Sequence, residues 1–288
     1  MASNVESENL TICLPGDRCN KHCPYCVSKM TPTFEEVSDS GFDAWMNNLK
    51  KVKYIASSAG IGSILITGKG EPSLRLWSDS TEDICNIFQE FPIEIQVNDI
   101  EIVKNHEKII RRLSFLGINT VAVSVDCLKY DLVTAISRLQ KAFILSSSVG
   151  MNNRISINVT NHTDIPHDLF EFFETLKSLK VDQVLLRNVI FPEDGEDSET
   201  KRWIKENTSF GKYEIFEKKI SDFIIDNNFK KIRTTKWGMN IYDVMGISYA
   251  MASECIQESA EFNHIRSLIY QQDAHLYTSW NSKASRLF

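Results

Sequence analysis

The chain has 288 residues, of which 42% are hydrophobic, and it carries a formal net charge of −6. This suits one large α/β domain, or one domain with a C-terminal elaboration. The net negative charge argues against nonspecific binding of nucleic acid, which needs a basic surface. No run approaches the ~20 apolar residues of a membrane span. The polar start, with no apolar leader segment, and the odd count of seven cysteines predict a cytoplasmic protein in a reducing compartment without membrane association.

Short apolar runs and helical spacings alternate along the first two thirds of the chain. Six runs predict strands at 10–14, 61–67, 93–97, 120–125, 154–160 and 183–189. Segments with helical spacing lie between them, at 34–58, 81–91, 103–116, 131–148 and 168–179. Strands that alternate with helices form βαβ units, so a parallel sheet is predicted, with its active site at the C-terminal ends of the strands.

Three cysteines follow the first predicted strand at a Cys-x3-Cys-x2-Cys spacing: Cys19, Cys23 and Cys26. A closed structural zinc site takes four protein ligands, and cubane iron–sulfur clusters usually take four cysteines. A loop with three thiolates therefore indicates a metal centre whose last position is filled by something other than protein. His22 is a poor fourth zinc ligand because it is adjacent to Cys23. A zinc-stabilised binding protein nevertheless stays open as the alternative that is not an enzyme.

With Tyr25 at the aromatic position of Cys-x3-Cys-x-aromatic-Cys, the loop resembles the signature of the radical S-adenosylmethionine (radical SAM) superfamily. The resemblance implies one [4Fe-4S] cluster, with Cys19, Cys23 and Cys26 on three of its irons. The amino and carboxylate groups of SAM would chelate the fourth iron. One electron, from a donor such as flavodoxin or ferredoxin, would cleave SAM to methionine and a 5′-deoxyadenosyl radical that abstracts hydrogen from substrate.

A second stretch, Gly68-Lys69-Gly70-Glu71-Pro72, follows the second predicted strand and resembles the Gly-Gly-Glu-Pro motif of the same superfamily. The resemblance implies that Gly68 and Gly70 let the backbone approach SAM, and that Glu71 holds its amino group. The chain departs from the commonest form of the motif, because Lys69 stands where the first glycine would be.

Polar residues gather at the ends of the later strands. Ser124 and Asp126 end the fourth strand, and the resemblance places such residues near the ribose and the substrate; a helix N-cap is the structural alternative for Asp126. The resemblance places the SAM ribose near the fifth strand, and Asn158 is our choice for the contact with its hydroxyls, with Ser156 as runner-up. Arg187 on the sixth strand could meet the methionine carboxylate, a substrate anion or an acid inside the barrel.

Six parallel strands without a seventh and eighth predict an open α/β fold, a partial (β/α)6 barrel of the radical SAM type with a C-terminal α+β extension. The predicted domains are the barrel at 1–192 and, at 193–288, an extension that caps the barrel and contributes to the substrate site. The extension begins with an acidic connector at 192–200, interpreted as a solvated loop. A helix follows at 212–228, and the segments 231–242 and 265–277 are interpreted as antiparallel strands beside the barrel opening.

The tail is loosely similar to that of the molybdopterin-precursor cyclase branch, but without the cysteines of an auxiliary cluster. Cys255 is the one cysteine left in it, so a single cluster is predicted. Substrate contacts are expected among His264, Arg266, His275 and Trp280, with ordinary packing as the alternative. Cys127, at the end of the fourth strand, is a candidate hydrogen-atom donor to a product radical.

The resulting functional hypothesis is a radical SAM enzyme that acts on a small-molecule or nucleotide-like substrate. Modification of a peptide or an RNA is an alternative, against which the missing auxiliary clusters and the acidic balance weigh. Nucleotide dehydration of the viperin kind is another, because such enzymes are also single-cluster partial barrels.

Overall fold

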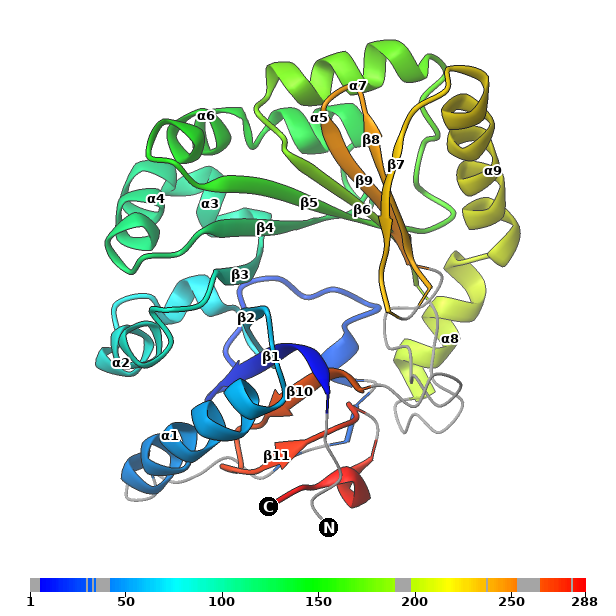
Figure 1. Cartoon of the computed structure of the whole chain (residues 1–288). Coiled ribbons are helices and arrows are strands. Elements are labelled where there is room, and N and C mark those ends of the chain that lie inside the picture. The colour runs from blue at the N-terminus through cyan, green and yellow to red at the C-terminus, as the bar shows by residue number, and fades with distance from the viewer. Residues whose placement is uncertain are drawn as a thin grey trace.

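A computed structural model describes residues 6–29, 31–32, 34, 42–189, 198–236, 238–252, 265–280 and 282–288. In these residues the strands join one curved sheet in the order β11-β10-β1-β2-β3-β4-β5-β6-β9-β8-β7 (Figure 1). The first six are β1 (Ser7–Leu14), β2 (Ser63–Gly68), β3 (Ile93–Asn98), β4 (Thr120–Val125), β5 (Asn152–Val159) and β6 (Gln183–Asn188). The other five are β7 (Lys231–Thr234), β8 (Asn240–Val244), β9 (Ile247–Ala252), β10 (Ile265–Tyr270) and β11 (Leu276–Tyr277).

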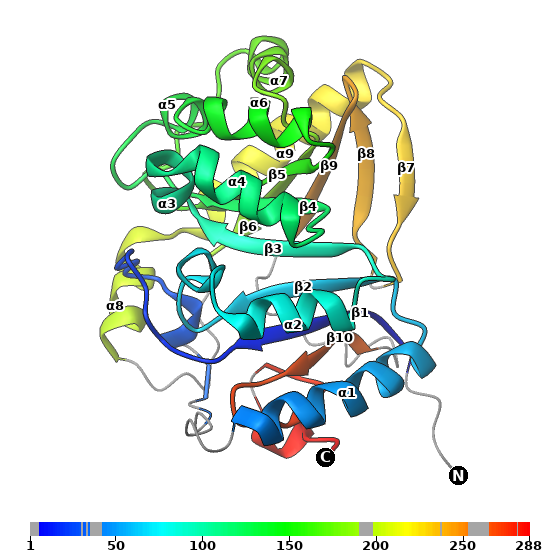
Figure 2. The ribbon, with the colours of Figure 1, turned by 90° about the vertical axis from the view of Figure 1, so that its left-hand side faces the viewer.

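Helices cover the outer side of this sheet, where α1, α2, α4, α6 and α7 follow one another in chain order (Figures 1 and 2). The helices of the barrel are α1 (Phe42–Ser58), α2 (Asp79–Ile87), α3 (Asp99–Lys104), α4 (His106–Phe115), α5 (Leu132–Ser137), α6 (Gln140–Ser148) and α7 (Leu169–Ser178). They are followed by α8 (Ser198–Asn207) and α9 (Phe210–Asp226), and short 3-10 turns lie at η1 (Val27–Lys29), η3 (Pro72–Arg75) and η4 (Lys283–Ser285). None of the helices in the described ranges has the length and apolar character needed to cross a bilayer.

The six predicted strands of the barrel are confirmed, and they pair in parallel in chain order. The expected place of the tail strands is only partly right. β7 and β8 are antiparallel, as predicted, but β10 pairs in parallel with β1, so the antiparallel interpretation of 265–277 is wrong for β10 and holds only for its pairing with β11. β9 likewise pairs in parallel with β6. The C-terminal strands therefore extend both edges of the six-stranded sheet.

Two predicted helices are each broken into two. The segment 103–116 begins earlier, at Asp99, and is interrupted at Asn105, whose backbone leaves the helical region with φ −127° and ψ 35°. The segment 131–148 separates into α5 and α6 around Arg138 and Leu139. Helix α8 was not predicted, because 192–200 was interpreted as a loop. Residues 190–197 lie outside the described residues, and they include the predicted domain boundary at 192 and most of the predicted connector.

The two faces of the sheet differ in polarity. On β4, for example, Val121, Val123 and Val125 are buried in the main core under the helices, whereas Thr120 and Ser124 of the opposite face are partly exposed. The inner, concave face of β3, β5 and β6 likewise carries polar side chains, except at Leu185, which lies in an apolar cluster with Ala250 and Ala252. A closed barrel fills its interior with apolar side chains, and the open sheet instead leaves a polar surface there.

The C-terminal tail is fixed to α1 and β1 by buried polar contacts. The Trp45 indole Nε1 donates to the Gln271 carbonyl at 3.1 Å, and the Tyr270 hydroxyl donates to the Trp45 carbonyl at 2.6 Å. Gln272, only 3% exposed, donates from Nε2 to the carbonyls of Leu14 (2.9 Å) and Gly16 (3.0 Å). The tail therefore supports the point where β1 passes into the cysteine loop.

Candidate active site

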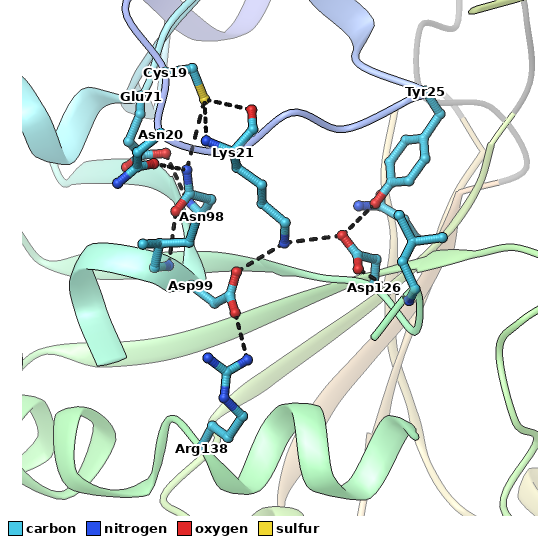
Figure 3. A network of polar contacts seen from close by, with 12 residues as sticks. Cys19, Asn20, Lys21, Tyr25, Glu71, Asn98, Asp99, Asp126 and Arg138 are labelled. Atoms are coloured by element: carbon cyan, nitrogen blue, oxygen red, sulfur yellow. Dashed lines mark hydrogen bonds and ion pairs between the residues drawn. The ribbon is translucent and has the colours of Figure 1, made fainter. Parts of the chain in front are cut away.

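The cysteine loop lies at the end of the sheet toward which the arrows of β1 and β2 point, beside α8 (Figure 2). Figure 3 shows Lys21 and Tyr25 of the loop reaching to the ends of β3 and β4. The Lys21 ammonium is 2.9 Å from Asp99 Oδ1 and 3.0 Å from Asp126 Oδ2. The Tyr25 hydroxyl donates to the same Asp126 Oδ2 at 2.8 Å. Two strand ends thus hold the loop through carboxylates.

The first cysteine of the loop is held through amide groups. Asn98, the last residue of β3, donates from Nδ2 to Asn20 Oδ1 at 2.8 Å and lies 3.9 Å from Cys19 Sγ (Figure 3). Asn20 in turn donates to Glu101 Oε1 at 3.1 Å. Burial raises the pKa of the Cys19 thiol more than the backbone N–H groups of Lys21 and Asn20, which are directed at its sulfur, lower it.

The three thiols suit a cluster by their state and exposure. All described cysteines are free, but Cys13, Cys85 and Cys127 are buried, and Cys19, Cys23 and Cys26 are partly exposed. Burial raises the pKa of the Cys23 thiol to about 12, and a bound metal ion would displace its proton. The described residues contain no group of three or more His, Cys, Asp or Glu spaced to hold a single metal ion. A cubane does not need such a group, because each cysteine binds a different iron.

The Gly68–Glu71 turn lies directly on the start of the cysteine loop. The Glu71 backbone N–H donates to the Arg18 carbonyl at 2.9 Å. A Cβ on Gly70 would lie 2.4 Å from that Arg18 oxygen and 2.9 Å from the Arg18 nitrogen, so only glycine permits the approach. The two motifs found in the sequence are therefore in backbone contact.

The Glu71 carboxylate is buried, with 4% exposure, and both its oxygens accept backbone N–H groups. Oε1 accepts from Ser73 at 3.0 Å and Oε2 from Asn98 at 2.8 Å. Burial raises the pKa of the Glu71 carboxyl more than these hydrogen bonds lower it. Glu71 thus joins the ends of β2 and β3. Each oxygen keeps a second lone pair, so its predicted contact with the SAM amino group stays a prediction.

Three of the predicted polar residues lie near one another on the inner face. Asn158 lies within hydrogen-bonding reach of the Tyr25 hydroxyl, which itself donates to Asp126. Ser124 and Ser156 are register partners on β4 and β5, and Ser156 is 3% exposed. The helix-cap alternative for Asp126 is not what the structure shows. Its Oδ1 accepts the Leu128 N–H at 3.3 Å in a turn, and Asp131 is the N-cap of α5.

A charged group that the sequence did not indicate lies deeper on the same face. Arg154 of β5 forms an ion pair with Glu94 of β3, and its Nε is buried without a hydrogen-bond partner. Arg187 of β6 is close enough to Arg154 for their charges to interact. No ion pair or hydrogen bond joins the Arg187 side chain to the described part of the chain. The third sequence-based option, pairing with an acid in the barrel, therefore finds no support there.

The remaining predicted residues lie away from this network. Cys127 is 6% exposed in the main core; burial raises the pKa of its thiol to about 11, more than the neighbouring Thr163 and Asp164 backbone lower it. Its role as a hydrogen donor stays a prediction. Trp280 packs against the buried cluster of Cys13, Phe34, Ile269 and Tyr277. His275 lies 3.6 Å from Asp273, and His264 lies outside the described residues.

α8 contributes packing that the sequence did not indicate. The rings of Trp203 and Tyr25 lie 5.5 Å apart, and Ile204 packs with Tyr25 and Val189 in a small buried cluster against which Cys23 rests. Residues 198–207 therefore form the outer wall of the cysteine loop. Their helical spacing was the available signal, but the acidic run before them obscured it.

A curved sheet with six parallel central strands, and with three free thiols on the loop after β1, is an open barrel whose loop could hold an iron–sulfur cluster. The family model described as "Radical SAM superfamily" matches residues 13–204, and the chain belongs to that superfamily. It is therefore an enzyme whose cofactors are a [4Fe-4S] cluster and SAM, as the sequence predicted. The alternative of a zinc-stabilised binding protein is set aside on this evidence.

Two curated relatives are named GTP 3′,8-cyclase. The protein of Clostridium acetobutylicum is 28% identical over 176 residues, which cover 60% of this chain and 46% of the relative. The protein of Lactiplantibacillus plantarum is 28% identical over 129 residues, covering 42% of this chain and 35% of the relative. The chain therefore spans less than half the length of either relative in these matches.

Solved structures share the fold. Streptococcus suis SuiB bound to S-adenosylmethionine has a TM-score of 0.61 at 16% identity, over 96% of this chain and 61% of that one. The native enzyme anSMEcpe with bound AdoMet has a TM-score of 0.59 at 16% identity, over 97% and 76%. At such identities the likeness shows the fold, here the open barrel.

Proposed function

We propose that this chain cleaves SAM reductively and directs the resulting radical to an anionic, nucleotide-like small molecule on the inner face of the sheet. When bound, the cluster supplies the electron that splits SAM into methionine and a 5′-deoxyadenosyl radical. The chain's own residues have the tasks of binding and orientation. Cys19, Cys23 and Cys26 would hold three irons, and the Gly68–Glu71 turn would hold the methionine end of SAM.

One observation carries the choice of substrate, namely the charge of the inner face. The charged residues of β3, β4, β5 and β6 are Glu94, Arg154 and Arg187, two cations against one anion. Glu94 is already paired with Arg154. A guanidinium offers a fork of N–H donors that suits phosphate oxygens. Arg187 makes no side-chain hydrogen bond or ion pair with the described residues, so it favours a phosphate-bearing ligand. The names of the relatives, GTP 3′,8-cyclase, agree with a nucleotide.

Asn158 and Ser156 suit the sugar of such ligands. Their amide and hydroxyl groups can exchange hydrogen bonds with ribose hydroxyls. Asn158 stands in register with Arg187 on the next strand. One molecule that contacts both residues would carry a sugar and an anionic group, as a nucleotide does; SAM, with its ribose and carboxylate, is the other ligand of this composition, and the Arg187 variant below separates the two. We also propose that flavodoxin or ferredoxin supplies the electron.

The test is a substrate screen with anaerobically reconstituted protein, SAM and either titanium citrate or reduced flavodoxin or ferredoxin. Deuterated nucleoside triphosphates, their nucleosides, a peptide mixture and RNA are offered in turn. We expect deuterium in 5′-deoxyadenosine from a triphosphate and little from its nucleoside. Transfer only from peptide or RNA would refute the proposal, and a dehydrated nucleotide product would identify the viperin-like alternative.

Arg187→Met separates the two remaining roles of Arg187. If Arg187 binds the substrate anion, the KM for the nucleotide rises roughly tenfold or more, while SAM cleavage without substrate keeps its rate. If Arg187 binds the methionine carboxylate, cleavage without substrate falls as well. Arg233→Met is the matched control, because Arg233 is an exposed arginine of β7, and we expect it to change neither quantity.

A further inference from the structure

Lys21 lies between the first two cysteines in the sequence of the loop, and its ammonium group forms ion pairs with two carboxylates. Its ammonium contacts Asp99 at 2.9 Å and Asp126 at 3.0 Å, and the three side chains are 20%, 15% and 8% exposed. A lysine that serves only solubility lies on a solvated surface. This one is directed inward, to the ends of two neighbouring parallel strands (Figure 3).

The contacts of Lys21 and Tyr25 converge on a single carboxylate. Lys21 precedes Cys23 by two residues and Tyr25 follows it by two, and both contact Asp126 Oδ2. Cys23 is therefore held from both sides by one anchor. The Leu128 N–H occupies the other oxygen of Asp126.

The second acid is fixed in the same way. Asp99 Oδ2 contacts Arg138 at 3.0 Å, while its Oδ1 contacts Lys21. Two cations and two anions thus alternate in the order Arg138, Asp99, Lys21, Asp126. Such a network has no net charge, so it is complete within the protein and needs no ligand to balance it.

We propose that Lys21, Asp99 and Asp126 form a charged clamp that positions the Cys23 thiol for cluster assembly before any iron is bound. The three are positioning residues, since they act on the cofactor through the cysteine loop. Asp126 was predicted from the sequence as a residue near the substrate. Lys21 and Tyr25 contact its Oδ2 and the Leu128 N–H contacts its Oδ1, so Asp126 holds the loop; its place near the substrate stays a prediction.

The test compares Lys21→Met with Lys21→Arg in the full-length chain, first without iron and then during anaerobic reconstitution. Hydrogen exchange of the peptide 19–26 in the iron-free protein reports the order of the loop. The rise of cluster absorbance and the iron content after desalting report assembly. We expect Lys21→Met to speed exchange of the loop and to slow assembly or weaken iron retention about 10–100-fold, the range for partners of metal ligands. Lys21→Arg, which keeps the charge, restores most of the rate.

Lys53→Met is the matched control, because Lys53 also makes a lysine–carboxylate pair, with Glu90 at 2.6 Å, but on the outer side of the sheet. It should leave both readouts unchanged. Unchanged loop exchange and assembly in Lys21→Met would overturn the clamp. If Lys21→Met fails to fold, Asp126→Asn decides by the same readouts, since asparagine keeps the shape and removes the charge. Wild-type behaviour there overturns the clamp, and faster exchange with slower assembly supports it.

Discussion

Gly70→Ala is the most direct test of the contact between the two sequence motifs. The new Cβ would lie 2.4 Å from the Arg18 carbonyl oxygen and 2.9 Å from the Arg18 nitrogen. Both atoms belong to the backbone, so no side-chain rotation relieves the overlap. The turn and the cysteine loop have to separate, and the 2.9 Å hydrogen bond from Glu71 N–H to Arg18 is lost.

The magnitude follows from these two losses. Overpacking costs about 1–3 kcal/mol, and a hydrogen bond contributes about 1 kcal/mol. We therefore expect the free energy of unfolding to fall by about 2–4 kcal/mol, which lowers Tm by about 4–10 °C in a chain of this size. Thermal unfolding of the iron-free protein measures this effect, and iron content after reconstitution measures its consequence at the cysteine loop.

Gly211→Ala provides the control, because the same methyl group meets nothing within 4 Å there, on helix α9. Alanine favours helix over glycine by up to about 1 kcal/mol, so Tm should stay unchanged or rise slightly. Gly70→Ala protein that melts and binds iron like the unsubstituted chain would show that the motifs are not in the contact described.

Three further predictions concern buried polar contacts. Glu94→Gln leaves the Arg154 guanidinium without its carboxylate, so we expect the free energy of unfolding, measured in urea, to fall by about 3 kcal/mol. Adding Arg154→Met should recover part of this loss; a double variant no more stable than Glu94→Gln alone would contradict the explanation. Burial raises the pKa of Asp99, but Lys21 and Arg138 outweigh it and hold that pKa below its ordinary value. The stabilisation is therefore present above a pH of about 4 and is lost as pH falls through the lowered pKa; Asp99→Asn should flatten this part of the stability–pH curve, and an unchanged slope would count against the network. Gln272→Leu removes the hydrogen bonds to the carbonyls of Leu14 and Gly16, which should cost about 2–4 kcal/mol; an unchanged Tm would exclude a role for Gln272 in holding the end of β1.

Much of the barrel could be predicted from the sequence because its signals are local. Each inner strand is an apolar or alternating run followed by turn residues, and chain order equals spatial order in βαβ units. The three cysteines and the Gly-Lys-Gly-Glu turn were found through their spacing. Their contact through Arg18 then follows from the shared edge of parallel strands.

The remainder depends on partners far apart in the chain. The alternation of polar and apolar residues in 265–270 is the same for a strand parallel to β1 and for a strand of an antiparallel hairpin, because the direction of a strand is set by the path of the connecting chain. The helix break at Asn105 could not be predicted from the sequence, because no proline or glycine lies at it. In the sequence Lys21 resembles an ordinary surface lysine, because its partners Asp99 and Asp126 lie about 80 and 100 residues later in the chain.

The position of β1 between β2 and β10 also affects how the protein is made. β1 can pair with β2 soon after residue 68 has been synthesised, but its other edge stays unpaired until residues 265–270 have emerged. Pairings over such sequence separations form slowly, and an open strand edge attracts other chains. The loop that follows β1 gains its full support only after residues 265–272 have been synthesised and have paired with β1 and its loop, so we expect iron loading to follow that pairing. Fragments that end before β10 should aggregate.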